Sequence, residues 1–212
     1  MNNLFSKVFL WLAAGLFISF GVAFYVSTNE NLVYNIFTKY YIWIIILELV
    51  LAFVLSLCIT KLSKAMTIVL YIGYAAVTGL TLSSVFLAYE LSSIIMIFLM
   101  TSIIFALLSV YGYITKKDVS KIGPILFFGL IGIIIVTILN IFVFKSSSFD
   151  TWISIISIII FLGFVVYDIN LIKRRMYDID DDKLAVYGAF QLYLDFVNIF
   201  LDLLRLFGES ND

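Results

Sequence analysis

The residues best suited to chemistry lie in the last apolar stretch of the chain, Tyr187 to Phe207. Its polar side chains follow one another at steps of 4, 3, 4 and 3 residues: Gln191, Asp195, Asn198, Asp202 and Arg205. At about 3.6 residues per turn, these steps place all five on one face of a helix. The other face is made of Leu, Phe, Val and Ile. The pattern predicts a polar stripe along a helix that is long enough to cross a membrane.

Asp195 would lie near the middle of that helix. A carboxylate at the bilayer centre costs at least about 2.5–3.5 kcal/mol on insertion scales, so the stripe must line a cavity or face other helices. Two interpretations follow. The stripe either joins helices through hydrogen bonds alone, or it belongs to a functional path, which is the default hypothesis for ionisable groups inside a membrane.

The composition is that of a polytopic membrane protein. Of the 212 residues, 64% are hydrophobic and only 13% are charged, far from the composition of a soluble domain. The absence of histidine excludes imidazole metal sites and Ser-His or Cys-His nucleophile pairs, and the single cysteine, Cys58, excludes an internal disulfide. We expect the lipid bilayer as a partner, no nucleic acid and no cofactor.

Seven apolar runs of membrane length, separated by polar breaks, predict an all-α integral membrane protein. The expected spans are approximately 8–27, 41–60, 65–89, 91–114, 122–144, 152–172 and 184–207. Only Tyr89 and Glu90 separate the third span from the fourth, so a tight turn is expected there. Pro124 falls in the first turn of its span, where its missing N–H is harmless. No linker divides the chain, so residues 1–212 are expected to form a single seven-helix domain.

The distribution of Lys and Arg predicts the orientation of the spans. Ten of the 13 basic residues fall on the side of the N-terminus: Lys7, Lys61, Lys64, Lys116, Lys117, Lys121, Lys173, Arg174, Arg175 and Lys183. The opposite side holds only Lys39, Lys145 and Arg205. The N-terminus is therefore expected in the cytoplasm and the C-terminus outside.

An acidic run follows the sixth span: Asp178, Asp180, Asp181 and Asp182. It lacks the glycine at the sixth position and the terminal bidentate Glu of an EF-hand calcium loop. A solvated cytoplasmic turn is the favoured interpretation.

With this orientation, the buried charges occupy successive depths. Asp168 lies about one turn inside the cytoplasmic end of its span, and Asp195 lies near mid-membrane. Glu48, Asp202 and Arg205 lie in the outer half. Oxygen ligands at successive depths suit an ion pathway. Ca²⁺ prefers carboxylate and carbonyl oxygens, so Asp195, Asp168 and Glu48 are candidate contacts for this ion.

Three segments carry a family resemblance: YDINLI (167–172), LYLDFVNIFLDLLRLFG (192–208) and ILE (46–48). With the seven-span layout, they resemble the transmembrane Bax inhibitor motif family, in particular its bacterial YetJ-like members, over essentially the whole chain. The resemblance implies six helices around a central seventh, in the inner membrane of a bacterial cell. It also implies a pH-sensitive calcium-leak channel, with Ca²⁺ as the transported ion and without enzymatic activity.

The resemblance also implies roles for individual residues. The YD and LYLDF aspartates of the family, here Asp168 and Asp195, form a hydrogen-bonded pair that senses pH. The outer Glu and Arg of the family would be Glu48 and Arg205, which we expect to approach each other.

Two positions depart from the family pattern. Bacterial relatives have an arginine at the cytoplasmic end of span two as a latch to the YD aspartate, whereas this chain offers Lys61 or Lys64. Lysine lacks the bidentate fork of arginine. Asp202 stands where a neutral residue is more usual, and it either adds negative charge to the outer path or neutralises Arg205.

Physical chemistry supports a pH response independently of the resemblance. Two carboxylates that approach in a low-dielectric site do not both ionise cheaply, so they share one proton. An ionised Asp168 would hold the basic latch, and protonation would weaken it. We therefore expect acid to favour opening.

The sequence leaves two alternative functions. Intramembrane aspartyl proteases of the presenilin type need GxGD around the second aspartate and a Pro-Ala-Leu element, whereas this chain has LYLD and its only proline is Pro124. The other alternative is a non-conducting regulator that binds other membrane proteins or proteases.

Overall fold

The computed structural model describes residues 2–174 and 179–211, so Arg175 and Asp178 lie outside the described residues. The α-helices are α1 (Asn2–Ser27), α2 (Glu30–Asn35), α3 (Tyr41–Leu57), α4 (Lys64–Ala88), α5 (Leu91–Ile114), α6 (Gly123–Leu139), α7 (Ser147–Arg174) and α8 (Asp181–Phe207). Three short helical segments join them: the π-helical η1 (Ile36–Tyr40) and η3 (Asn140–Phe144), and the 3₁₀ segment η2 (Ser120–Ile122).

Within the described ranges, seven helical spans are long and apolar enough to cross a membrane, which confirms the predicted fold class. The turn at Tyr89 and Glu90 is confirmed between α4 and α5, and Pro124 lies in the first turn of α6. Of these seven spans, α8 is the most buried. In its apolar stretch 78% of the residues are buried, against 6% in the span that contains α6.

The second span begins 11 residues before its predicted start, because α2, η1 and α3 run without a break from Glu30 to Leu57. Asn29 starts this helix by accepting a hydrogen bond from the Leu32 N–H at 3.2 Å. Residues 28–39 include several polar side chains, so hydropathy alone does not indicate that the helix begins at Glu30.

The α6–α7 turn is also tighter than predicted, since α7 already begins at Ser147. Lys145 adopts a left-handed conformation with φ 50°. The Asn140 side chain donates to Ser146 O at 3.1 Å and to Asp150 Oδ1 at 2.7 Å, which fixes the turn.

The chain forms two compact units. Unit 1 comprises Met1–Leu91, Tyr177–Tyr193 and Ser210–Asp212, and unit 2 comprises Ser92–Met176 and Leu194–Glu209. Helix α8 contributes residues to both units. The single domain expected from the sequence stays a prediction.

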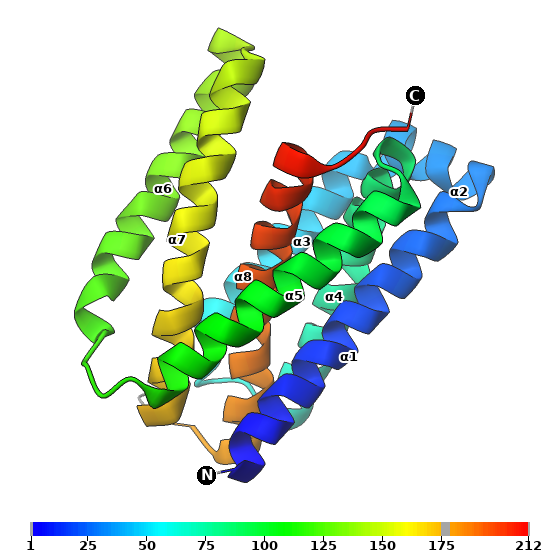
Figure 1. The fold of residues 1–212 in the computed structure, drawn as a ribbon. Coiled ribbons are helices and arrows are strands. Elements are labelled where there is room, and N and C mark those ends of the chain that lie inside the picture. Colours follow the sequence, from blue (N-terminus) through cyan, green and yellow to red (C-terminus); the bar gives the residue numbers. More distant parts are fainter. Residues whose placement is uncertain (1, 175–178, 212) are drawn as a thin grey trace. The chain divides into compact units, whose positions relative to one another are not determined.

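In unit 1, α1 and α4 lie side by side (Figure 1). They approach closely at Gly79, where an added Cβ would lie 2.7 Å from the carbonyl oxygen of Ser19. At Gly21 and Gly73, by contrast, an added Cβ would meet nothing within 4 Å.

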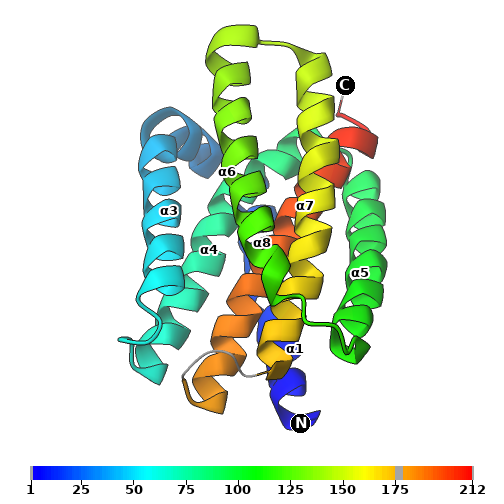
Figure 2. The same cartoon turned by 90° about the vertical axis from the view of Figure 1, so that its left-hand side faces the viewer.

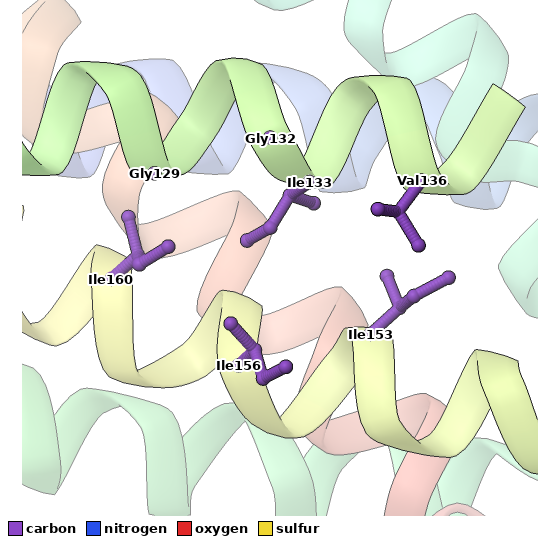
Figure 3. Close-up of a pocket in the computed structure, with 7 residues that line it drawn as sticks. All are labelled: Gly129, Gly132, Ile133, Val136, Ile153, Ile156 and Ile160. Atoms are coloured by element: carbon purple, nitrogen blue, oxygen red, sulfur yellow. The ribbon is translucent and has the colours of Figure 1, made fainter.

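In unit 2, α6 and α7 form an antiparallel hairpin (Figure 2). A cavity of about 230 Å³ lies between them, and Figure 3 shows isoleucine and valine side chains of both helices pointing toward one another there. Its lining residues are Gly129, Gly132, Ile133, Val136, Ile153, Ile156 and Ile160. The side chains are all hydrocarbon, so this cavity offers no side-chain ligand for an ion.

The α1–α4 contact yields a first prediction. We expect Gly79→Ala to destabilise the protein by about 1–3 kcal/mol, because the new methyl group would press against the backbone of α1. Gly73→Ala on the same helix is the matched control, and we expect it to be neutral or stabilising by up to about 1 kcal/mol, since alanine is the better helix former. Thermal unfolding in detergent measures both. Equal effects of the two substitutions would contradict the close approach at Gly79.

Candidate functional site

The carboxyl groups of Asp168 on α7 and Asp195 on α8 are in hydrogen-bonding contact in unit 2. Both residues are buried, with only 4% and 3% of their surfaces exposed. A carboxylate carries no donor, so a hydrogen bond between two carboxyl groups requires one shared proton. The structure thus brings together the two aspartates that the sequence singled out.

Helix α5 sets the orientation of α7 beside this pair. Gly112 allows close approach, since an added Cβ would lie 2.9 Å from Val166 O, and Asn170 donates to Gly112 O at 3.4 Å. Asp168 lies two residues before Asn170, about 200° around the helix. Helix α5 therefore covers the Asn170 face of α7 and leaves the opposite face for Asp168.

Aromatic rings hold α8 against α5 next to Asp195. The Phe196 ring packs edge-on against Phe98 and Phe105, with centroids 5.2 and 5.5 Å apart. The Phe200 ring adds a contact with Phe98 at 6.2 Å. These contacts restrain the rotation of α8 about its axis, which is what a buried carboxyl contact needs.

Asp195 retains one carboxylate oxygen for further interactions. Its buried Oδ2 has no hydrogen-bond partner among the described residues, and neither has the Oγ of Ser109 or the Oδ1 of Asn170. Ser109 and Asn170 are not among the site residues expected from the sequence. The rule that buried polar groups require partners could have found Asn170, two residues after Asp168.

A second polar cluster surrounds Asp202, also in unit 2. Arg205 Nη1 lies 3.3 Å from Asp202 Oδ1 and donates to Ser154 Oγ at 3.1 Å. Ser154 and Ser157 on α7 interact with the Asp202 carboxyl group. Of the two alternatives left open for Asp202, the contacts favour neutralisation of Arg205. The serines were missed, although their three-residue spacing places them on one face of α7.

Glu48 has its partners in unit 1. Thr78 donates to Glu48 Oε1 at 2.7 Å, and Thr81 donates to Glu48 Oε2 at 3.2 Å. Neither threonine is among the expected site residues, although their three-residue spacing places both on one face of α4. The expected pair of Glu48 and Arg205 joins residues of different units and stays a prediction.

The candidate latch residue Lys64 donates to Asp182 Oδ2 at 2.6 Å, and Lys7 donates to Asp182 Oδ1 at 2.5 Å. This clasp ties α1, α4 and α8 together within unit 1. The side chain of Asp182 is 41% exposed, so solvent screens both ion pairs and they contribute little to stability. A latch between Asp168 and Lys61 or Lys64 stays a prediction.

Within residues 2–174 and 179–211, no group of three or more acidic or cysteine side chains could hold a metal ion. The acidic run serves other contacts: Asp182 binds the two lysines, and Asp180 accepts from the Lys183 N–H at 3.0 Å.

The full length of the chain, residues 1–212, matches the sequence profile described as "Inhibitor of apoptosis-promoting Bax1". The chain belongs to the Bax inhibitor family. Among members of this family, the "Inner membrane protein YbhL" of Escherichia coli (strain K12) is 38% identical over 217 residues, which cover 99% of this chain and 92% of YbhL. A protein of Borreliella burgdorferi is 37% identical over 218 residues, covering 100% and 94% of the two chains. An uncharacterized membrane protein of Streptococcus pyogenes is 33% identical over 219 residues, with the same coverage.

The shared proton of the carboxyl pair is open to a spectroscopic test. We expect the infrared spectrum to contain the C=O band of a protonated carboxyl group that disappears in both Asp168→Asn and Asp195→Asn. An asparagine amide can donate to the remaining carboxylate, so either variant keeps a hydrogen bond without the proton. Asp202→Asn is the control and should leave the band in place. A band that survives in either of the two paired variants would contradict the shared proton.

Proposed function

We propose that this member of the Bax inhibitor family is a pH-sensitive calcium-leak channel of the bacterial inner membrane, with Asp168 and Asp195 as its gate. The observation that carries the proposal is the hydrogen bond between these two carboxyl groups, both nearly fully buried in membrane-length helices. The strength and the net charge of such a contact depend on how many protons the two carboxyl groups hold. In this proposal the number of protons on the pair sets the state of the gate.

The proton count determines the direction of gating that we propose. With one shared proton, the pair keeps one negative charge, which attracts a basic side chain. A second proton removes that charge, so acid opens the channel. Lys61 and Lys64 are the proposed basic partners, and Lys64 would have to leave Asp182 to reach the pair.

The chemistry of the buried oxygens supports Ca²⁺ as the transported ion. Asp195 Oδ2 is available, and Asp202 adds a further carboxylate in the outer half of α8, flanked by Ser154 and Ser157. Glu48 and its two threonines supply oxygens in unit 1. Hard divalent cations select such carboxylate, hydroxyl and carbonyl ligands. Arg205 limits the net negative charge beside Asp202.

Calcium flux into dye-loaded proteoliposomes, measured between about pH 5 and 8, tests the channel. We expect flux that rises with acid, and we expect Asp195→Asn to flatten the pH dependence or shift it to lower pH. Asp202→Asn should change the amount of flux with little change of its midpoint. An Asp195→Asn protein with the wild-type midpoint and steepness would refute the gate, and no flux at any pH would favour a non-conducting regulator.

Asp118 provides a matched control outside the membrane spans. Hydrogen bonds from Ser120 hold the pKa of the Asp118 carboxyl below its usual value of 3.8, and the charges of Arg174 and Lys121 lower it further. This carboxyl group stays ionised over the whole assay range. Asp118→Asn should therefore leave the pH dependence of flux unchanged.

The proposed orientation, with the N-terminus in the cytoplasm, is tested by labelling single cysteines in a Cys58→Ser background. We expect Asn31→Cys to react with an impermeant reagent added to the outside of intact cells. Asp118→Cys should react only after permeabilisation. Equal accessibility of the two positions would overturn the seven-crossing topology.

A further inference from the structure

The two ends of the α6–α7 hairpin in unit 2 differ in charge. Five basic side chains and one carboxylate belong to the described residues where α5 leads into α6 and where α7 ends: Lys116, Lys117, Lys121, Lys173, Arg174 and Asp118. The turn between α6 and α7 holds one charge of each sign, Lys145 and Asp150. The first end is therefore strongly positive and the second is neutral, so an anionic molecule in the bilayer is attracted to the first end.

The last turn of α7 holds the loop between α5 and α6 in place. Arg174 Nη2 donates to Lys117 O at 2.9 Å, and Lys173 Nζ donates to Thr115 O at 3.4 Å. The carboxylate of Asp118, also in this loop, lies 3.7 Å from Arg174 Nη1. The two basic residues of α7 therefore bind the loop itself, and the charge of Asp118 is paired with one of them.

Three lysines of this loop keep their charges available. Lys116, Lys117 and Lys121 are exposed. Among residues 2–174 and 179–211, their ammonium groups have no hydrogen-bond or ion-pair partner. A phosphate group at this end of the hairpin would therefore meet three unpaired positive charges, which is the arrangement that anionic lipid headgroups favour.

A stripe of exposed residues leads from the last of these lysines into the cavity of the hairpin. Steps of 4, 3, 4 and 4 residues place the stripe on one side of the helical run Ser120–Phe144: Lys121, Ile125, Phe128, Gly132 and Val136. Ile125 and Phe128 are 71% and 70% exposed. Gly132 and Val136 line the cavity, so the stripe begins at a cation and ends at a hydrocarbon-lined space.

The length of this stripe matches one leaflet of a bilayer. Gly132 lies 11 residues after Lys121, which corresponds to a rise of about 17 Å at about 1.5 Å per residue. The hydrocarbon core of a bilayer is about 30 Å thick, so one leaflet contributes about 15 Å. A lipid with its headgroup at Lys121 would therefore place the end of an acyl chain beside Gly132.

The cavity is suited to hydrocarbon. Its volume is about 230 Å³, and Figure 3 shows the aliphatic side chains that line it. An apolar cavity of about 150 Å³ already takes up a molecule of the size of benzene. An added Cβ at Gly132 would meet nothing within 4 Å, whereas at Gly129 it would lie 2.8 Å from Ile160 Cδ1. The space is therefore open at Gly132, but a helix about 10 Å in diameter is far too wide for it.

We propose that the α6–α7 hairpin binds an anionic phospholipid, with the phosphate on Lys116, Lys117 and Lys121 and the end of one acyl chain in the cavity. Positive charge at one end and hydrocarbon along the rest match the two parts of such a lipid. A free phosphate or an apolar helix matches only one of them. The site lies within unit 2 and does not include Asp168 or Asp195, so the inference goes beyond channel activity.

Photoreactive lipids test the site in the full-length protein, reconstituted in phosphatidylcholine bilayers. Two probes carry the same acyl chain with a diazirine at its end and differ only in the headgroup, which is anionic phosphatidylglycerol or zwitterionic phosphatidylcholine. Mass spectrometry locates the labelled peptides. We expect the anionic probe to label residues 129–136 and 153–160 several-fold more than the zwitterionic probe.

Substitution of the lysines tests the headgroup contact. The combined variant Lys116→Gln, Lys117→Gln and Lys121→Gln should remove the excess labelling by the anionic probe. Lys145→Gln, at the neutral end of the same hairpin, is the matched control and should leave the excess in place. These side chains are on the surface, so their replacement does not disturb the packing of the helices.

Filling the cavity tests the acyl chain. Gly132→Leu should reduce the labelling of both peptides several-fold, whereas Gly21→Leu on α1, where an added Cβ also meets nothing within 4 Å, should not. Equal labelling by the two probes, or an excess that persists without the three lysines, would overturn the proposal. A cavity that neither probe labels would overturn it too, because protein would then cover the site. The readout does not use ion flux, so failure of the lipid site and failure of the channel are distinguishable.

Discussion

A carboxyl group among membrane-spanning helices must find its hydrogen-bond partners on those helices, because hydrocarbon offers none. The structure satisfies this constraint in three ways. Asp168 and Asp195 bind each other through a shared proton, Asp202 contacts an arginine and two serines, and Glu48 accepts from two threonines. Each solution ties at least two helices together. The carboxyl groups therefore contribute to the architecture as well as to the proposed ion path.

These polar contacts respond differently to pH and to salt. A carboxyl pair that shares a proton depends on pH, whereas the hydroxyl donors around Glu48 carry no charge. The exposed clasp of Lys7, Asp182 and Lys64 is different again, because salt screens exposed ion pairs much more than buried ones. High ionic strength should therefore loosen the clasp while leaving the buried groups intact.

The sequence predicted the helices and the acidic residues better than it predicted their partners. Hydropathy and polar breaks located the seven spans, and the polar stripe of α8 identified Asp195 and Asp202, because charged side chains are conspicuous in an apolar helix. The hydroxyl partners carry no signal in the sequence, because a hydroxyl side chain costs little free energy anywhere in a membrane helix. These partners are Thr78, Thr81, Ser154 and Ser157. Their roles depend on how neighbouring helices are rotated about their axes, and no spacing within a single helix contains that information.

The second span contains the π-helical turn η1, which determines how the span responds to the deletion of a residue. A π-helical turn such as η1 accommodates one residue more than an α-helical turn, so the apolar face shifts its phase between α2 and α3. No single helical period describes residues 30–57. Deletion of one residue within Ile36–Tyr40 would convert this turn to ordinary α-helix and leave both flanking helices in their original register. A deletion elsewhere in the span would rotate every later side chain by about 100°.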